Sequence, residues 1–425
     1  MNGARARRLT RGANRARDNA GFTLVELMVA LTGGLFISLA VFALARDSGR
    51  FYQREARLAN ATVSGLIGFE RLRADLARAG FLASPNITKD RSVCAIPDGT
   101  WPAGLRNLAS LQVSAPSVSY AALTANGRTP PVITLAGSYS SSDVYGAKVV
   151  PAGNKVIFEL STKEAAGALR RLGNGGIPSD TTMKAAFPRG RVLRVVQNGK
   201  QYYGQIIDAA GGGTQPSVTI SQQPPIQFRS GSAIGCGLSD VVGSGASTPM
   251  INVVNFIQYE VRPPQTPTAI AGYKNLFTNS ADAPGEAGRT ELTRVELDID
   301  GQVIDGTEEI VAEYAVDLNL QLIAVTNKTD CCPTLSLISP GDPTYSTFTG
   351  PVFNSLNSPQ LIRSVRVRLG VRSREADRTA TITNPAGQGL FRFNIGSGTT
   401  ETFARVRTFQ ADVALHNQAD VLWWQ

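Results

Sequence analysis

The hydrophobic pattern is strongest near the N-terminus, where an apolar run extends from Leu27 to Ala45 and closes at Arg46 and Asp47. A helix of about 20 residues rises about 30 Å, which matches the hydrocarbon core of a bilayer. The run follows residues 1–20, which carry six arginines and one aspartate. Because positively charged flanks stay in the cytoplasm, the pattern predicts one membrane-spanning helix with an exported C-terminal bulk.

A second pattern, with apolar residues at steps of three or four or multiples of them, continues the helix beyond the membrane. The stripe consists of Phe51, Leu58, Thr62, Leu66, Phe69, Leu72 and Leu76. Charged residues lie between these positions, as on a solvated opposite face. Gly80 is a natural C-cap, and Pro85 forbids much continuation. We therefore expect a transmembrane half over residues 22–45 and an amphipathic half over 46–80.

The rest of the chain is expected to form short strands separated by connectors rich in Gly, Pro, Ser and Thr. The strongest signal is a hairpin, with strands 191–196 and 200–207 on either side of Asn198-Gly199. Further strands are predicted at 133–136, 155–160, 217–220, 251–261, 291–299, 314–325, 361–371 and 402–415. The predicted fold class is α+β, a long N-terminal helix packed on a large, mainly antiparallel head. We expect a first subdomain or insertion at 95–250 and a C-terminal head at 251–425.

One charged residue, Glu26, lies at the start of the membrane segment. A carboxylate at the centre of a membrane helix costs about 2.5–3.5 kcal/mol, and less near its end. In the first helical turn it also gains from the helix dipole. One interpretation is a tolerated interfacial Glu. The other is that Glu26 needs a cation, which cleavage after Gly21 would create in the α-amine of Phe22.

The hexapeptide Gly-Phe-Thr-Leu-Val-Glu at residues 21–26, between a basic leader and an apolar run, resembles the type IV prepilin (class III) processing site. The resemblance implies that residues 1–21 are a leader, removed after Gly21 by a prepilin peptidase that methylates Phe22. It also implies that Glu26 pairs with the N-terminus of a neighbouring subunit. The implied partners are the prepilin peptidase, other minor and major pilins, and the inner membrane.

Two other targeting signals compete with this interpretation. Ala43-Leu44-Ala45 resembles a signal-peptidase site that would release a chain starting at Arg46, but the apolar run is too long for an h-region. Arg7-Arg8 suggests twin-arginine export, but no apolar residue follows in the expected place.

Small residues recur at four-residue spacing in the membrane segment, at Ala30, Gly34 and Ser38. Small side chains on one face let helix backbones approach closely, as in a filament core. Ordinary membrane-helix composition explains the same spacing equally well. The sequence leaves both interpretations open.

Segments of the head narrow the resemblance to minor pilins of the PilW family. These segments are Arg73–Phe81 at the helix end, the strand Ile310–Leu322, and the C-terminal pair Ser364–Arg374 and Thr402–Asn417, where His416 departs from the family's Arg. The resemblance implies a pilin-like lollipop in the inner membrane with a periplasmic head. It further implies a subunit that primes or caps pilus assembly and then reaches the cell surface. The alternatives are a type II secretion minor pseudopilin of the J class, or a tip adhesin that binds an unidentified surface ligand through 95–300.

The positive charge belongs partly to the leader. Removing residues 1–21, with six Arg and one Asp, lowers the formal net charge from +9 to +4. The high charge is therefore weak evidence for nucleic-acid binding.

Four cysteines fit an exported, oxidised protein: Cys94, Cys236, Cys331 and Cys332. Three connectivities exist. A bond between the adjacent Cys331 and Cys332 closes a strained eight-membered ring, so each is expected to pair with Cys94 or Cys236. Free buried thiols are the alternative.

The sequence offers no catalytic or metal-binding pattern. His416 is the sole histidine, and no Gly-x-Ser-x-Gly or phosphate-binding loop is present. Residues 296–301 resemble part of a calcium loop, but its twelfth position is Thr307 where a bidentate Glu is needed. A strand ending in an Asp-Gly turn explains these residues better. We expect a non-enzymatic protein without a cofactor or metal.

Overall fold

The structure is a computed structural model that describes residues 22–94, 97–161, 166–213, 215–229, 236–239, 247–263, 288–327, 334–353, 357–376, 392–396 and 402–419. The leader with Gly21, and Cys331 and Cys332, lie outside the described residues. The chain divides into two compact units, residues 1–56 and 57–425, which we describe in turn.

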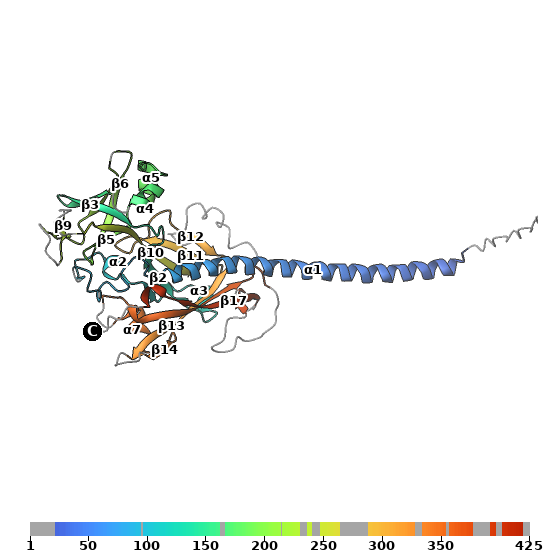
Figure 1. The fold of residues 1–425 in the computed structure, drawn as a ribbon. Helices are drawn as coiled ribbons and strands as arrows, with labels where there is room; N and C mark the ends of the chain where they lie inside the picture. Colours follow the sequence, from blue (N-terminus) through green and yellow to red (C-terminus); the bar gives the residue numbers. More distant parts are fainter. Residues whose placement is uncertain are drawn as a thin grey trace, which may run out of the picture. The chain divides into compact units, whose positions relative to one another are not determined.

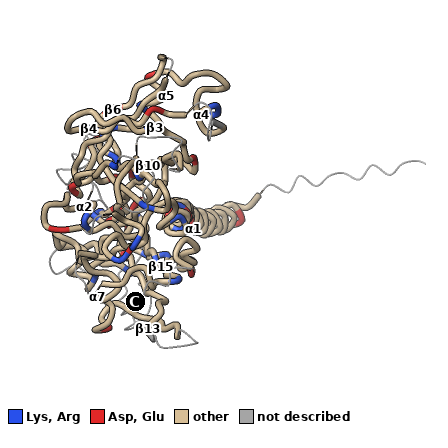
Figure 2. Tube along the Cα trace, turned by 60° about the vertical axis from the view of Figure 1, so that its left-hand side comes forward, with Lys and Arg blue, Asp and Glu red and all other residues tan. Residues whose placement is uncertain are grey.

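The first unit contains the start of a long helix, α1, which spans Leu24–Ala77 (Figure 1). Among the described residues, α1 is long and apolar enough to cross a membrane, judged by length and composition. Acidic and basic residues are absent from Leu27 to Ala45, so this part of α1 is tan in Figure 2. The expected long N-terminal helix is confirmed.

In the second unit, the final turns of α1 pack into the largest hydrophobic core. Leu58, Phe69, Leu72 and Leu76 are buried, as the stripe predicted. Phe51 and Leu66 of the same stripe are not, because they are 60% and 46% exposed. The helix presents two glycines to the sheets instead. A Cβ on Gly65 would lie 2.6 Å from Val371 and one on Gly68 would lie 2.5 Å from a backbone oxygen, so both positions require glycine for close approach.

A ten-stranded sheet follows, in which every strand pairs antiparallel with its neighbours. Its strands are β1 (Leu111–Ser114), β2 (Val132–Gly137), β3 (Tyr145–Ala152), β4 (Lys155–Leu160), β5 (Val192–Gln197), β6 (Lys200–Ala210), β7 (Ser217–Ser221), β10 (Met250–Arg262), β11 (Glu291–Leu297) and β12 (Glu309–Ala312). The predicted hairpin is confirmed as β5–β6, and Asn198 and Gly199 both adopt the positive φ that its two-residue turn needs.

Strand β10 joins two parts of this sheet. Its first residues, from Met250, pair with β3 and β5, and its later residues pair with β2 and β11. The path β10-β3-β4-β7-β6-β5 returns to β10, so these six strands close on themselves around their own core. Two helices pack against that core, α4 (Ala166–Leu172) and α5 (Asp180–Ala186). Strands from both sides of residue 250 therefore belong to one sheet, and the expected division into 95–250 and 251–425 stays a prediction.

The second sheet has five strands in the order β14-β13-β15-β17-β16. They span Thr334–Ile338 (β14), Ala315–Asn327 (β13), Ile362–Arg372 (β15), Phe403–Ala414 (β17) and Arg392–Asn394 (β16). The C-terminal part of α1 lies between the two sheets, with Phe69 stacked on Phe409 of β17 at 5.9 Å between ring centroids (Figure 1). The chain passes from one sheet to the other near Tyr314, which has φ 55°.

Short elements complete the fold. They are α2 (Ala103–Arg106), α3 (Ala121–Thr124), α7 (Tyr345–Thr349), the 3-10 turns η1 (Pro359–Leu361) and η2 (His416–Gln418), and the two-residue strands β8 (Phe228–Arg229) and β9 (Leu238–Ser239). Strands β8 and β9 pair in parallel. The α+β class with mainly antiparallel sheets is confirmed.

Candidate processing and assembly site

The first turn of α1 is a capping box. The Thr23 hydroxyl accepts a hydrogen bond from the Glu26 backbone N–H at 3.2 Å, and Glu26 Oε2 accepts one from the Thr23 backbone N–H at 3.2 Å. The Thr23 hydroxyl also donates to Oε2 at 3.1 Å. Thr-x-x-Glu before an apolar run is the sequence signature of this cap, and the sequence analysis missed it.

The capping box fixes a carboxylate at the helix N-terminus, next to the expected cleavage point. Phe22 directly precedes Thr23 and is 83% exposed. The hydrogen bonds that Glu26 makes within the described residues use Oε2, which leaves Oε1 open to a cation. A free amine on Phe22, or on another chain, is a cation of the size and charge that this carboxylate could bind.

The small residues Ala30, Gly34 and Ser38 all lie on α1 and are exposed. Their spacing of four places them along one side of the helix. A Cβ built on Gly34 meets nothing within 4 Å, so no contact with the described part of the chain requires glycine there. Thr32, in the same segment, donates its hydroxyl to Met28 O at 2.9 Å, which satisfies a polar group within the apolar helix.

A buried acid near the end of α1 holds the helix in the second unit. Asp75 Oδ2 accepts a hydrogen bond from the Tyr259 hydroxyl at 2.7 Å and from Arg294 Nε at 2.9 Å. Burial, and next the charge of Asp75, hold the pKa of Tyr259 well above its usual value of 10. Burial alone would lower the pKa of Arg294, but its hydrogen bond and ion pair with Asp75 raise it overall.

The helix exit is fixed by further polar contacts. Arg78 Nη2 donates to Ser138 O at 2.7 Å, and Gly80 N–H donates to Ala136 O at 2.8 Å. Gly80 lies in the turn after α1, which ends at Ala77, and its φ of 77° favours glycine. Asn417 Nδ2, after the last strand, donates to Ala79 O at 3.1 Å. The segments Arg73–Phe81 and Thr402–Asn417, which carried the family resemblance separately, therefore meet here.

Arg372, the last residue of β15, and Ser373 after it also have a structural role. Arg372 is fully buried, lies over the Tyr314 ring at 5.0 Å, and donates to Ser373 O at 3.0 Å. Arg289 covers the same ring at 4.6 Å. Strand β15 thus ends in an arginine that packs on Tyr314, where the chain passes from one sheet to the other.

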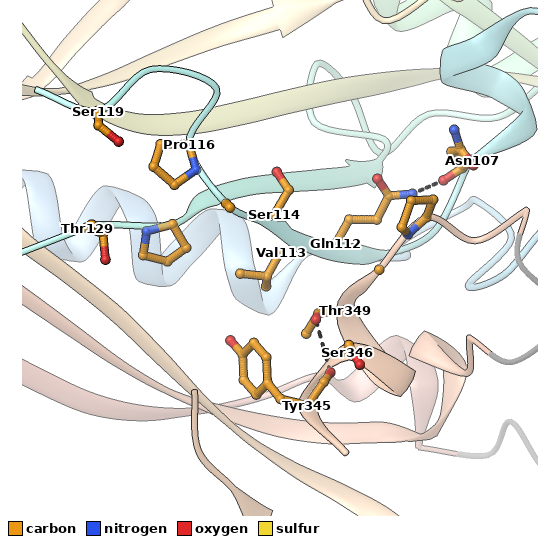
Figure 3. Close-up of a pocket in the computed structure, with 14 residues that line it drawn as sticks. Asn107, Gln112, Val113, Ser114, Pro116, Ser119, Thr129, Tyr345, Ser346 and Thr349 are labelled. Carbon is orange, nitrogen blue, oxygen red and sulfur yellow. Dashed lines mark hydrogen bonds between the residues drawn. The ribbon is translucent and has the colours of Figure 1, made fainter. Parts of the chain in front are cut away.

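A cleft of about 740 Å³ opens beside β1 and α7 (Figure 3). Figure 3 shows side chains of β1, such as Val113 and Ser114, on one side, and Tyr345 and Thr349 of α7 on the other. Its lining residues are uncharged: Asn107, Gln112, Val113, Ser114, Ala115, Pro116, Ser119, Thr129, Pro131, Tyr345, Ser346, Thr349, Gly350 and Pro351. The surface suits a neutral ligand. No local pattern in the sequence predicts the cleft, because two distant segments form it.

The other residues singled out in the sequence have structural roles or are exposed. Asp298 Oδ1 accepts from the backbone N–H groups of Asp300 and Gln302, so residues 296–301 are a strand ending in a turn. His416 is exposed. Within the ranges that the structure describes, no group of three or more metal-ligating side chains gathers.

Comparison of the chain with protein-family models, with curated proteins and with solved structures finds no match.

Proposed function

We propose that this chain is a minor type IV pilin, processed after Gly21, that joins an inner-membrane complex priming or capping pilus assembly. The observation that carries the proposal is the N-terminal turn. A carboxylate fixed by a capping box, directly after Gly21-Phe22, begins a helix long enough to span a membrane. The proposal includes a pilin-like lollipop shape and membership of the PilW family, and both rest on the sequence resemblance.

In this mechanism the uncleaved chain waits as a single-pass membrane protein with a periplasmic head. Cleavage gives Phe22 a positive α-amine, and Glu26 Oε1 is the oxygen left for such a charge. Two opposite charges in an apolar environment attract far more strongly than in water. Pairing with the amine of a neighbouring subunit therefore favours packed helices over isolated ones.

An exposed apolar face within the second unit also supports helix–helix assembly. Val63, Leu66 and Ile67 of α1 are 57%, 46% and 65% exposed, although the opposite face of the same helix is buried. Exposed apolar groups of this kind mark interaction surfaces. We propose that neighbouring pilin helices cover them.

Glu26→Gln tests the pairing role without removing the cap, because Gln also completes a capping box. We expect Glu26→Gln to be cleaved normally but to fall at least about tenfold in sheared pili, since a 1.4 kcal/mol loss alone gives that factor. Thr23→Ala, which removes the cap and keeps the charge, is the matched control and should still enter pili. Immunoblots of pilus and membrane fractions measure both.

Incorporation of Glu26→Gln at the wild-type level would refute the charge-pairing mechanism. A secretion pseudopilin shares the same N-terminal turn, and deletion of the gene separates the two proposals. Loss of pili with normal exoprotein secretion supports the minor pilin, and the reverse supports the pseudopilin.

A second candidate function is a tip adhesin, and the uncharged cleft beside β1 and α7 is the observation that favours it. Deleting 95–250 would remove partners of β10, so a substitution that fills the cleft is a cleaner test. Ser114→Trp, at an exposed position in the cleft, should abolish adhesion while piliation continues. Thr181→Trp, exposed on α5 outside the cleft, is the control. Unchanged adhesion in Ser114→Trp counts against this function.

A further inference from the structure

Two cysteines that lie far apart in the sequence are brought to the same part of strand β6. Cys94 N–H donates to Gln201 O at 3.2 Å, and Val93 forms a bridge with Gln201. On the other side, the N–H of Gly237 donates to the Tyr202 hydroxyl at 2.8 Å. Adjacent residues of β6 therefore position the backbone next to each cysteine, independently of any attraction between the thiols.

The two cysteines lie at the same small cavity. Cys94 and Cys236, both half-buried and both free in this structure, line this cavity together with Tyr202. Burial, and then the contact with Cys94, raises the pKa of the Cys236 thiol to about 11. Cys236 is thus protonated near neutral pH, unlike the low-pKa thiols of catalytic or metal-binding sites.

The surroundings of the two cysteines leave no room for a ligand larger than one or two water molecules. Both thiols line a cavity of about 40 Å³, which has room for one or two waters only. Apart from the two cysteines, the described lining residues include no His, Asp, Glu or Cys, the side chains that most often bind metals. Two free thiols that line one such cavity fit a structural disulfide.

We propose that Cys94 and Cys236 form a disulfide in the exported protein. The proposed function enters only through the oxidising compartment that it implies. A protein or small-molecule disulfide supplies the oxidising equivalents. One thiolate attacks the donor disulfide and releases one donor thiol, and the second thiolate then displaces the other donor sulfur. The Cys94–Cys236 bond forms, two thiol protons leave, and the donor takes up two electrons to become two thiols.

The bond would join the segment that follows α1 to the segment that precedes β9, beside strand β6. Such a cross-link restricts the unfolded chain and so stabilises the fold. It also uses Cys94 and Cys236, the two residues that the sequence suggested as partners of Cys331 and Cys332.

Peptide mapping of the full-length protein tests the pairing. The chain is purified in detergent, reduced, equilibrated with a mixture of oxidised and reduced glutathione, blocked and digested with trypsin without reductant. Tryptic cleavage places Cys94 in peptide 92–106, Cys236 in 230–274, and Cys331 with Cys332 in 329–363. We expect peptide 92–106 linked to peptide 230–274. Either peptide linked to 329–363, or both thiols blocked, overturns the proposal while leaving the proposed function intact.

Thermal stability and the native protein give independent readouts. Reductant should lower the Tm of the wild type by about 5 °C or more. It should leave the doubly substituted Cys94→Ser/Cys236→Ser chain unchanged, whereas Cys331→Ser/Cys332→Ser should respond like the wild type. The same link must appear in protein taken from its native membrane. A bond formed in glutathione buffer but missing from native protein overturns the proposal for the exported chain and also counts against export.

Discussion

At the scale of single residues, Asp75 does most to hold the helix in the second unit. Its carboxylate is 6% exposed and accepts hydrogen bonds from Tyr259 and Arg294. A buried ion pair is weak evidence of stabilisation by itself, but loss of one partner leaves the other charge buried and uncompensated. This asymmetry makes Asp75 a sharper test of packing than any exposed pair.

We expect Asp75→Asn to lower the free energy of unfolding by about 3–5 kcal/mol, because Arg294 would stay buried and charged after losing the acid at 2.9 Å, with Glu309 left at 3.8 Å. Urea unfolding of the full-length protein in detergent measures the change. Asp412→Asn is the matched control, since the Arg366–Asp412 pair has a similar N–O distance of 2.7 Å but is exposed. That variant should behave like the wild type. Equal stability of the two variants would contradict the buried role of Asp75.

At the scale of elements, the second-unit part of α1 lies between two sheets because glycines replace larger side chains at its closest contacts. Gly65 faces Val371 and Phe409 of the five-stranded sheet, whereas Gly68 faces Val311 and Ala312 beside the ten-stranded sheet. These two residues therefore set how closely the helix approaches each sheet.

Gly68→Ala should destabilise the head by about 1–3 kcal/mol, because the added Cβ meets a backbone oxygen that cannot move independently of its strand. The loss outweighs the gain of about 1 kcal/mol in helix propensity. Gly49→Ala lies on the same helix with nothing within 4 Å and should stabilise slightly or have no effect. Tm values that rise for both variants would show that Gly68 does not set the packing distance.

The sequence predicted those elements whose signals are local. The strands with strong apolar patterns and the Asn198-Gly199 hairpin lie close to where they were expected. Strand β3 was missed because Gly146 and Pro151 interrupt its pattern, and α4 and α5 because seven residues are too few for a clear helical period. Closure of the six-stranded part depends on β10 pairing with β5, a contact between distant segments that no local pattern encodes.

The candidate site also has features that the sequence alone predicts and features that only the fold brings together. The Gly21–Glu26 motif was visible in the sequence, and the capping box between Thr23 and Glu26 could have been, since its spacing is local. The meeting of Asn417 with the end of α1 and the uncharged cleft needed the fold, because each joins segments more than 200 residues apart.

At the scale of the whole molecule, the head buries several tyrosines that hold their protons more tightly than in the unfolded chain. Burial is the main cause of the raised pKa of Tyr139 and Tyr259, and it raises the pKa of Tyr145 and Tyr203 to about 12. Near neutral pH these tyrosines are protonated in both the folded and the unfolded states. Their effect on stability therefore begins only where the unfolded chain ionises, at about pH 10.

We expect the free energy of unfolding to fall as the pH rises from about 10 to about 12. Over this interval the unfolded chain releases tyrosine protons that the folded chain keeps. This ionisation lowers the free energy of the unfolded state relative to the folded state. Urea unfolding at several pH values, with phenolate absorbance recorded in parallel, measures both effects. A constant stability over this range, with phenolate already formed in the folded protein, would contradict the buried state of these tyrosines.

The most direct test of the central claim is the N-terminal residue and intact mass of the mature protein from its native host. The proposed function predicts a chain that starts at Phe22 and carries one added methyl group. A chain that starts at Arg46, or one that keeps the leader, would contradict prepilin processing and with it the role proposed for Glu26.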